Sequence, residues 1–342
     1  MTDRQTDRQT DRQTNYDLLR AISAIFVIVI HVNANYLNVE SKDINFTSII
    51  QNWINVITRV SVPCFVMMSG AFVLKKKRID NIIDFYKKTL CKLGIPFFIM
   101  WLFWGTCTTI HGIHIGRTLA QLILPWLRMT YGSLWFMPMI LCLYFLVPFI
   151  NIIKMSVSNR AFGFLALCTL ILAVISQGSS GYILPYSIGV IAAYSSYFLL
   201  GSFLYEKRNV QISSAGLLIF LLILSVLTTW FRCKVSQHYA LDPYKAFFSP
   251  SIMLMSICFF IIFKQYKMRR CFWIEWISKR TFYIYLIHPI FVRLLVEIIN
   301  NLQCSVLLKT LYVTLISFIL SIIVSSIWIY IRRYLNSRYI TE

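Results

Sequence analysis

Arg20 and His31 stand at the two ends of an otherwise apolar run, residues 21–30, in the first hydrophobic segment. A helix rises about 1.5 Å per residue, so His31 would lie roughly 16 Å deeper along the axis than Arg20. The hydrocarbon core of a bilayer is about 30 Å thick, so an arginine at the interface places this histidine near mid-membrane. Ionisable groups are costly at that depth and usually have a function.

The residue types at these positions suggest a division of roles. Asp17 precedes Arg20 by three residues, so the two can share one helix face and the carboxylate can hold the guanidinium. Arg20 at the inner interface suits a phosphate-bearing ligand that arrives from the cytoplasm. A neutral His31 suits a general base. The alternatives are that Arg20 is one more interfacial anchor and that His31 is structural.

Membrane helices must position these residues, because the chain is 58% hydrophobic over 342 residues and has a mean hydropathy of +0.67. We predict an all-α polytopic membrane protein with about ten transmembrane helices. The apolar segments are residues 18–36, 50–74, 93–110, 134–153, 161–177, 182–205, 212–231, 247–263, 281–299 and 311–331.

The net charge of +20 is explained by membrane topology, without a nucleic-acid partner. Of the 33 Lys and Arg residues, 24 lie in termini and loops on one side of the membrane, and seven lie in loops on the other side. The positive-inside rule then places both termini in the cytoplasm. The nine cysteines show no ligand spacing, and His111 and His114 lack a nearby carboxylate, so we expect no metal.

The N-terminal residues 1–15 are predicted to be a disordered arm, ahead of a transmembrane domain at 16–335 and a cytoplasmic tail at 336–342. Residues 2–13 repeat Thr-Asp-Arg-Gln three times. One uninterrupted tetranucleotide repeat can encode this peptide, and such repeats slip during replication. We therefore hypothesise phase-variable expression. Sequencing the gene from single colonies tests it, and a constant repeat number in mixed codons would contradict it.

Five segments in order resemble the membrane acyltransferase-3 family of bacterial surface-glycan O-acyltransferases. The first is the Arg20 and His31 pair, separated by ten residues. The others read RVSVPCFVMMSG at 59–70, SLWFMP at 133–138, YFLLG at 197–201 and YIYLIHP at 283–289. The resemblance covers nearly the whole chain after residue 15. It is nearest to the single-domain branch associated with acetylation of the enterobacterial common antigen.

The resemblance implies a donor site and a reaction. Arg20 would contact the phosphates of acyl-CoA, and His31 would be the catalytic histidine. Ser69 and Gly70 would allow close backbone approach near the acyl donor. His31 would either deprotonate a sugar hydroxyl that attacks the thioester or carry the acyl group covalently through the membrane. The sequence does not choose between these two mechanisms.

Other polar residues are candidates for the donor or acceptor side. The basic residues Lys75 and Lys76 could grip the phosphates of CoA. Arg59 could orient the acceptor or stabilise an oxyanion, or it could be a snorkelling arginine. His288 could be a second polar group in the cavity or a structural hydrogen-bonding group, and Trp135 fits an aromatic belt better than a sugar platform.

The sequence thus predicts an inner-membrane O-acetyltransferase, with acetyl-CoA as donor and a surface or lipid-linked glycan as acceptor. Membrane lipids surround it, and no nucleic acid is expected as a partner. The main alternative is a transporter or flippase for a lipid-linked saccharide. Proton-coupled transporters carry buried carboxylates, whereas here Glu297 is the one acidic residue within a predicted segment. A non-catalytic assembly protein is a further alternative.

Overall fold

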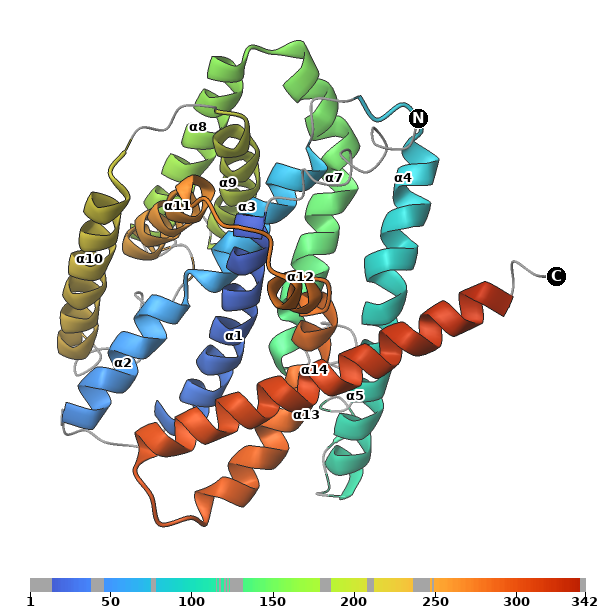
Figure 1. Cartoon of the computed structure of the whole chain (residues 1–342), viewed down its shortest axis with the longest axis vertical. Coiled ribbons are helices and arrows are strands. Elements are labelled where there is room, and N and C mark those ends of the chain that lie inside the picture. The colour runs from blue at the N-terminus through green and yellow to red at the C-terminus, as the bar shows by residue number, and fades with distance from the viewer. Residues whose placement is uncertain are drawn as a thin grey trace.

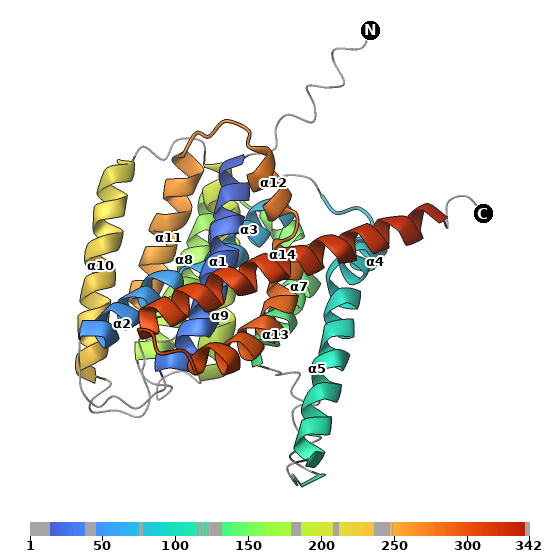
Figure 2. The same cartoon turned by 60° about the horizontal axis from the view of Figure 1, so that its bottom comes forward.

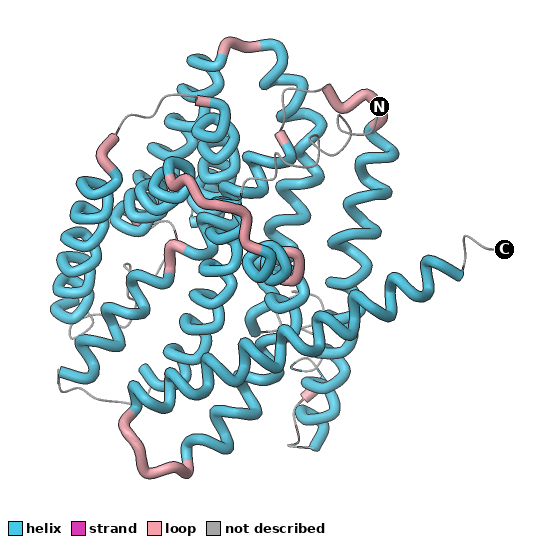
Figure 3. The backbone as a smooth tube through the Cα atoms, viewed as in Figure 1, coloured by secondary structure: helices cyan, strands magenta, loops and turns pink. Residues whose placement is uncertain are grey.

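The described part of the chain in the computed structural model is built from helices, with no strand in it (Figure 3). It comprises residues 14–37, 46–74, 78–114, 116, 118, 119, 121, 123, 132–178, 186–207, 212–235, 247 and 249–338. The helices are α1 (Thr14–Leu37), α2 (Phe46–Thr58), α3 (Ser61–Val73), α4 (Ile82–Thr89), η2 (Leu90–Gly94), α5 (Ile95–His114), η3 (Gly132–Trp135), α7 (Phe136–Ser156), α8 (Asn159–Gly178), α9 (Tyr186–Glu206), α10 (Ser214–Val235), α11 (Pro250–Gln265), α12 (Phe272–Ser278), α13 (Thr281–Asn300) and α14 (Val306–Arg338).

The all-α polytopic prediction is confirmed. Among the described residues, eight helical stretches are long and apolar enough to cross a membrane. The two other predicted segments coincide with α9 and with α11, and α11 is a shorter apolar helix. The repeat at 2–13 lies outside the described residues, while α14 continues to Arg338, beyond the domain boundary expected at 335.

Helix α1 lies at the centre of the bundle, where it contacts α2, α3, α11, α12, α13 and α14 (Figure 1). Its buried residues Tyr16, Leu19 and Val27 belong to the main hydrophobic core. Helix α14 crosses obliquely over α1 and α13, and α10 and α5 stand on opposite flanks (Figure 2). A residue on α1 can therefore meet side chains from most of the surrounding helices.

The segment expected to be one span at 50–74 is two helices, α2 and α3, with a turn at Arg59 and Val60 between them. Pro63 explains the break. A proline has no N–H for the carbonyl four residues earlier, which is that of Arg59, and its ring clashes with that carbonyl. Arg59 is thereby placed at an interruption inside a membrane segment, and not on the face of a continuous helix.

A second proline shapes the rod formed by α4, η2 and α5. Pro96 cannot donate to the carbonyl of Lys92, and the helix widens there into the π-helical turn η2, in which the N–H of Ile95 reaches back to Leu90. Such π-turns are frequent at functional sites. Lys92 lies within this turn.

Helices α3 and α9 are packed backbone against backbone. A Cβ atom on Gly70 would overlap the carbonyl oxygen of Phe198, and one on Gly201 would overlap the carbonyl oxygen of Met67. Only glycine permits this approach from both sides, as in other small-residue helix contacts in membranes. The two helices are consequently fixed against each other along the length of the contact.

A buried ion pair ties the ends of three helices together. Lys154 of α7 lies 2.6 Å from Glu206 Oε1 and 2.7 Å from Ser202 Oγ, both on α9. Its ammonium also donates to the carbonyl of Leu74, the C-cap of α3. Breaking a buried pair of this kind costs about 3–5 kcal/mol, because one charge stays buried alone. The pair therefore fixes the C-terminal end of α3 relative to α7 and α9.

Candidate active site

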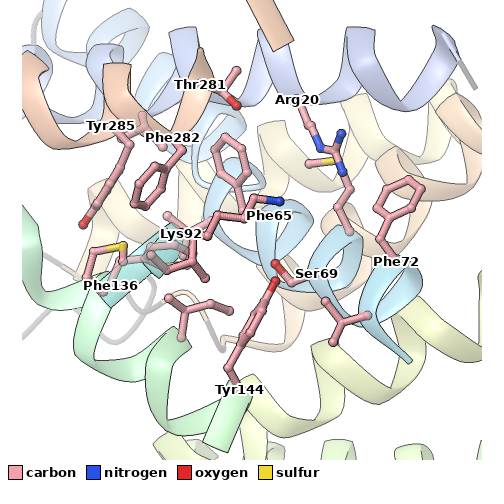
Figure 4. Close-up of a pocket in the computed structure, with 17 residues that line it drawn as sticks. Arg20, Phe65, Ser69, Phe72, Lys92, Phe136, Tyr144, Thr281, Phe282 and Tyr285 are labelled. Carbon is pink, nitrogen blue, oxygen red and sulfur yellow. The ribbon is translucent and has the colours of Figure 1, made fainter. Parts of the chain in front are cut away.

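A cavity of ≈ 320 Å³ opens between α1, α3, η2, α7 and α13 (Figure 4). One end carries Arg20, and the other is formed by Phe136 and Tyr285. The walls between them are mostly apolar. The lining residues are Arg20, Val27, Val62, Phe65, Met68, Ser69, Phe72, Val73, Lys92, Leu93, Phe136, Met137, Ile140, Tyr144, Thr281, Phe282 and Tyr285.

Two cations from different helices face this cavity, Arg20 of α1 and Lys92 of η2. Arg20 donates to Asp17 Oδ1 at 3.5 Å, and its guanidinium lies 4.6 Å from the ring centre of Phe72. Asp17 is buried and also accepts from Ser278 Oγ at 2.6 Å. The predicted Asp17–Arg20 pair is thus formed. Its carboxylate is fixed by α12, so the guanidinium is held in one place.

A pair of hydroxyls lies across the cavity from Arg20. The side chains of Ser69 and Tyr144 are hydrogen-bonded to each other (Figure 4). Gly70 is not part of this wall: it packs against α9, and its close backbone approach is to Phe198. The close backbone approach that Gly70 permits is thus to helix α9, and a role of Gly70 beside an acyl donor stays a prediction.

His31 and His288 lie side by side one helical turn beyond the cavity, with ring centres 5.2 Å apart. Both continue a face that lines the cavity. His31 follows Val27 by four residues on α1, and His288 follows Tyr285 by three on α13. Each histidine therefore lies on the same helix face as that cavity-lining residue, about one turn further along. His288 is fully buried, whereas His31 is partly exposed.

The hydrogen bonds of His288 fix its tautomer. Its Nδ1 lies 3.2 Å from the carbonyl oxygen of Ile284, which can only accept, so Nδ1 carries the proton. Nε2 then bears the lone pair, and this buried atom has no hydrogen-bond partner among the described residues. Pro289 contributes as the sequence suggests: it leaves the carbonyl of Tyr285 free, and His288 also bonds to that carbonyl.

Arg59, at the break between α2 and α3, is near enough for its charge to act on His31. Its Nε donates to Asn55 Oδ1 at 2.9 Å, and Arg232 of α10 donates to the same oxygen at 2.9 Å. The guanidinium of Arg59 also lies 5.2 Å from the ring centre of Phe247. These contacts hold Arg59 toward the bundle, unlike a snorkelling arginine that extends to the interface.

Trp135 packs against Phe247, with ring centres 5.5 Å apart, and also against Tyr194 at 6.1 Å. It is partly buried against the main core. This differs from a ring in a lipid-facing aromatic belt, since its faces contact other aromatic rings of the bundle. Arg59, Phe247 and Trp135 form a continuous cation and aromatic group, and within it Arg59 is near enough for its charge to act on His31.

The structure brings together most of the residues that the sequence singled out. Arg20 and Ser69 line the cavity, and Arg59 and His288 lie beside His31. Lys75 and Lys76 lie outside the described residues. The sequence reasoning missed Lys92, Phe72, Tyr144 and Tyr285 as lining residues. For Lys92 a signal exists, since Pro96 four residues later marks a disturbed helix turn.

In the portion of the chain that the structure describes, no group of three or more His, Cys, Asp or Glu side chains could hold a metal ion. The nine cysteines are free thiols. The polar side chains that line the cavity carry guanidinium, ammonium and hydroxyl groups, with the Asp17 carboxylate paired to Arg20 and two imidazoles one turn beyond. This set suits an anionic ligand and a proton transfer.

Comparison with known proteins gives one match. The family model of the acyltransferase-3 type, described as an acyltransferase domain, matches residues 13–330. No curated protein and no solved structure matches the chain. The matched range contains all of the cavity and both histidines.

Proposed function

The chain belongs to the acyltransferase-3 family and is a membrane acyltransferase, and we propose that it transfers an acetyl group from acetyl-CoA to a hydroxyl of a cell-surface or lipid-linked glycan. One observation carries this proposal. A cavity with two cations at its walls runs along α1 and ends one turn before a pair of histidines. A phosphate-bearing thioester and a base are the chemistry that this arrangement suits.

The donor would occupy the cavity. Arg20 and Lys92 would bind its phosphates, Arg20 with a planar group that matches phosphate oxygens in pairs. The apolar walls would enclose the pantetheine arm. The cavity extends in the right direction for this orientation. Val27, which also lines it, lies seven residues, or about 10 Å, beyond Arg20 along α1, toward His31. The thioester end would then point toward His31.

The reaction would proceed on the far side of the cavity. His31 removes the proton from the glycan hydroxyl as its oxygen attacks the thioester carbonyl. The tetrahedral oxyanion lies near Arg59, whose charge would stabilise it. The carbon–sulfur bond then breaks, and the thiolate takes the proton from His31. The products are the glycan acetate ester and CoA with a free thiol. In the alternative relay, His31 itself carries the acetyl group before the hydroxyl accepts it.

His288 and the group beside Arg59 would serve the acceptor side. The lone pair on His288 Nε2 has no partner among the residues that the structure describes, and a buried polar atom without one costs about 1–3 kcal/mol. The ring N–H of His31, whose ring centre lies 5.2 Å from that of His288, would satisfy it. Trp135 and Phe247 present aromatic faces near Arg59. This combination suits a sugar ring.

The test compares surface glycans from cells with the intact gene, a deletion and the His31→Ala variant by mass spectrometry. The mass increment of one acetyl group should appear only with the intact gene. His114→Ala is the matched control, because His114 is exposed at the end of α5 and does not line the cavity. Membrane abundance of each variant is measured by immunoblot.

Two outcomes would contradict the proposal. If intact and His31→Ala cells carry the same acetylated glycan, His31 is not the base. If both carry glycan that the deletion lacks altogether, with no acyl difference, the protein exports a lipid-linked saccharide. Glu297, the acidic residue within a predicted segment, is exposed on α13, and the largely buried carboxylates of Asp17 and Glu206 are paired with Arg20 and Lys154.

We also propose the bacterial inner membrane as the location, with both termini in the cytoplasm. Arg20 and Lys92 then face the compartment that contains acyl-CoA. Reporter fusions at residues 1 and 342 test this orientation, and a periplasmic signal at either end would contradict it. Phase variation through the repeat at 2–13 stays a hypothesis that colony sequencing tests.

A further inference from the structure

Tyr285 and Phe136 close the end of the cavity nearest the histidines. Their rings meet edge to face, with centres 5.4 Å apart. The Tyr285 hydroxyl is also hydrogen-bonded to the backbone of Phe136, at the first residue of α7. Figure 4 shows both residues at the opposite end from Arg20. A ring contact and a hydrogen bond together hold this wall between α7 and α13.

His288 lies directly behind this wall, and His31 lies beside His288. The ring centre of Tyr285 is 5.8 Å from that of His288, on the same face of α13. His288 has an exposed fraction of 0%, so no space large enough for a water molecule adjoins its ring. Open volume therefore lies on the Arg20 side of Tyr285, and the space between Tyr285 and His288 is filled, while His31 beside them is partly exposed.

We propose that Tyr285 is a specificity-determining residue that limits the donor to short acyl groups. This inference rests on the proposed function. The thioester carbon has to reach His31, and the part of the acyl chain beyond that carbon must then fit next to the closed Tyr285 and Phe136 pair. Each added methylene needs volume there that the packed rings do not leave. A short acyl group needs the least.

The hydroxyl and the ring of Tyr285 have separable effects. The ring fills the space, whereas the hydroxyl holds the ring against Phe136. Tyr285→Ala therefore should enlarge the acyl space, and Tyr285→Phe should leave it nearly unchanged. A purely structural role for Tyr285 would lower transfer of every acyl group in proportion, without changing the preference among them.

The experiment uses membranes from producing cells, which supply their own acceptor, with radiolabelled acetyl-CoA, propionyl-CoA and butyryl-CoA. Label in the glycan fraction gives kcat/KM for each donor. Intact protein should prefer acetyl-CoA. In Tyr285→Ala the ratio of butyryl to acetyl transfer should rise at least about tenfold, and in Tyr285→Phe it should change by less than about twofold. Tyr312→Ala, at an exposed tyrosine on α14, is the matched control and should keep the original ratio.

An unchanged ratio in Tyr285→Ala would overturn the inference, and so would intact protein that uses butyryl-CoA as well as acetyl-CoA. In both cases acyl transfer persists and the proposed function stands. If intact protein transfers no acyl group from any donor, the proposed function itself fails. If Tyr285→Ala does not accumulate in the membrane, Phe136→Leu replaces it, because this change opens the same wall from α7. A rise in the ratio of butyryl to acetyl transfer in Phe136→Leu then supports the inference, and an unchanged ratio overturns it.

Discussion

The two ends of the Arg20 to His31 segment of α1 are built in different ways. At the Arg20 end, charges are held by partners: Asp17 binds Arg20, and Ser278 binds Asp17. At the His31 end, α2 and α3 are separated by a break before Pro63, and among the described residues the Nε2 of His288 has no hydrogen-bond partner. The first arrangement is typical of a rigid binding site. The second leaves groups available for a reaction, so we expect binding to depend on the first end and rate on the second.

The sharpest test of this comparison is His31→Ala. Loss of a general base should lower kcat for acetyl transfer by about 10³-fold, while KM for acetyl-CoA changes little, because the cavity is intact. Steady-state kinetics on membranes measures both. A rise in KM at constant kcat would reverse the assignment of the two ends.

Arg20→Ala should have the opposite signature. A charge-assisted contact to phosphate contributes about 1.5–3 kcal/mol, so KM for acetyl-CoA should rise roughly 10- to 100-fold with kcat nearly unchanged. Arg20→Lys should recover only part of the loss, because an ammonium cannot pair with two oxygens at once. Equal losses in kcat and kcat/KM would show that Arg20 acts in the transition state instead.

Lys92→Met should give a smaller effect of the same kind. The methionine keeps the apolar stem that covers the cavity wall and removes only the charge. We expect KM for acetyl-CoA to rise about tenfold. Measuring KM for a dephosphorylated CoA ester in parallel shows whether Lys92 meets a phosphate. If the variant and the intact protein differ equally for both donors, Lys92 does not contact the phosphate that was removed.

Asp17→Asn should have the smallest effect. The amide can still accept from Ser278 but no longer neutralises Arg20, which would lose orientation and not charge. An increase in KM of about threefold to tenfold is expected. Ser278→Ala removes the support of Asp17 from the other side and should change KM less. A larger effect on kcat than on KM in either variant would mean that this end of α1 takes part in the chemical step.

The sequence predicted what depends on one segment at a time. The length of an apolar run determines whether it can span a bilayer, so the predicted ranges fall on helices. The rise along one helix relates Arg20 to His31 before any packing is known. The segment predicted at 50–74 falls within one candidate span, Phe46–Val73, but this span is divided into two helices because Pro63 acts on the carbonyl of Arg59, a local effect that the apolar run conceals.

What depends on several helices could not be predicted in the same way. Tyr285 lies in a segment that the family resemblance had marked, yet its position on the cavity wall requires the approach of α7 to α13. Gly70 was assigned to the donor because a glycine indicates a close neighbour but does not identify it. In the structure that neighbour is the backbone of Phe198. Lys154 was placed in a loop, although it is buried on α7 beside Glu206.

The Lys154–Glu206 pair also constrains the order in which the protein is assembled in the cell. The two residues are 52 positions apart, so at a synthesis rate of about 5–20 residues per second the lysine emerges roughly 3–10 s before its carboxylate. During that interval α7 carries a charge that a bilayer disfavours. Helix α7 therefore settles into the bundle only once the ribosome has delivered α9, and nascent chains that stop before residue 206 should be cleared by membrane proteases.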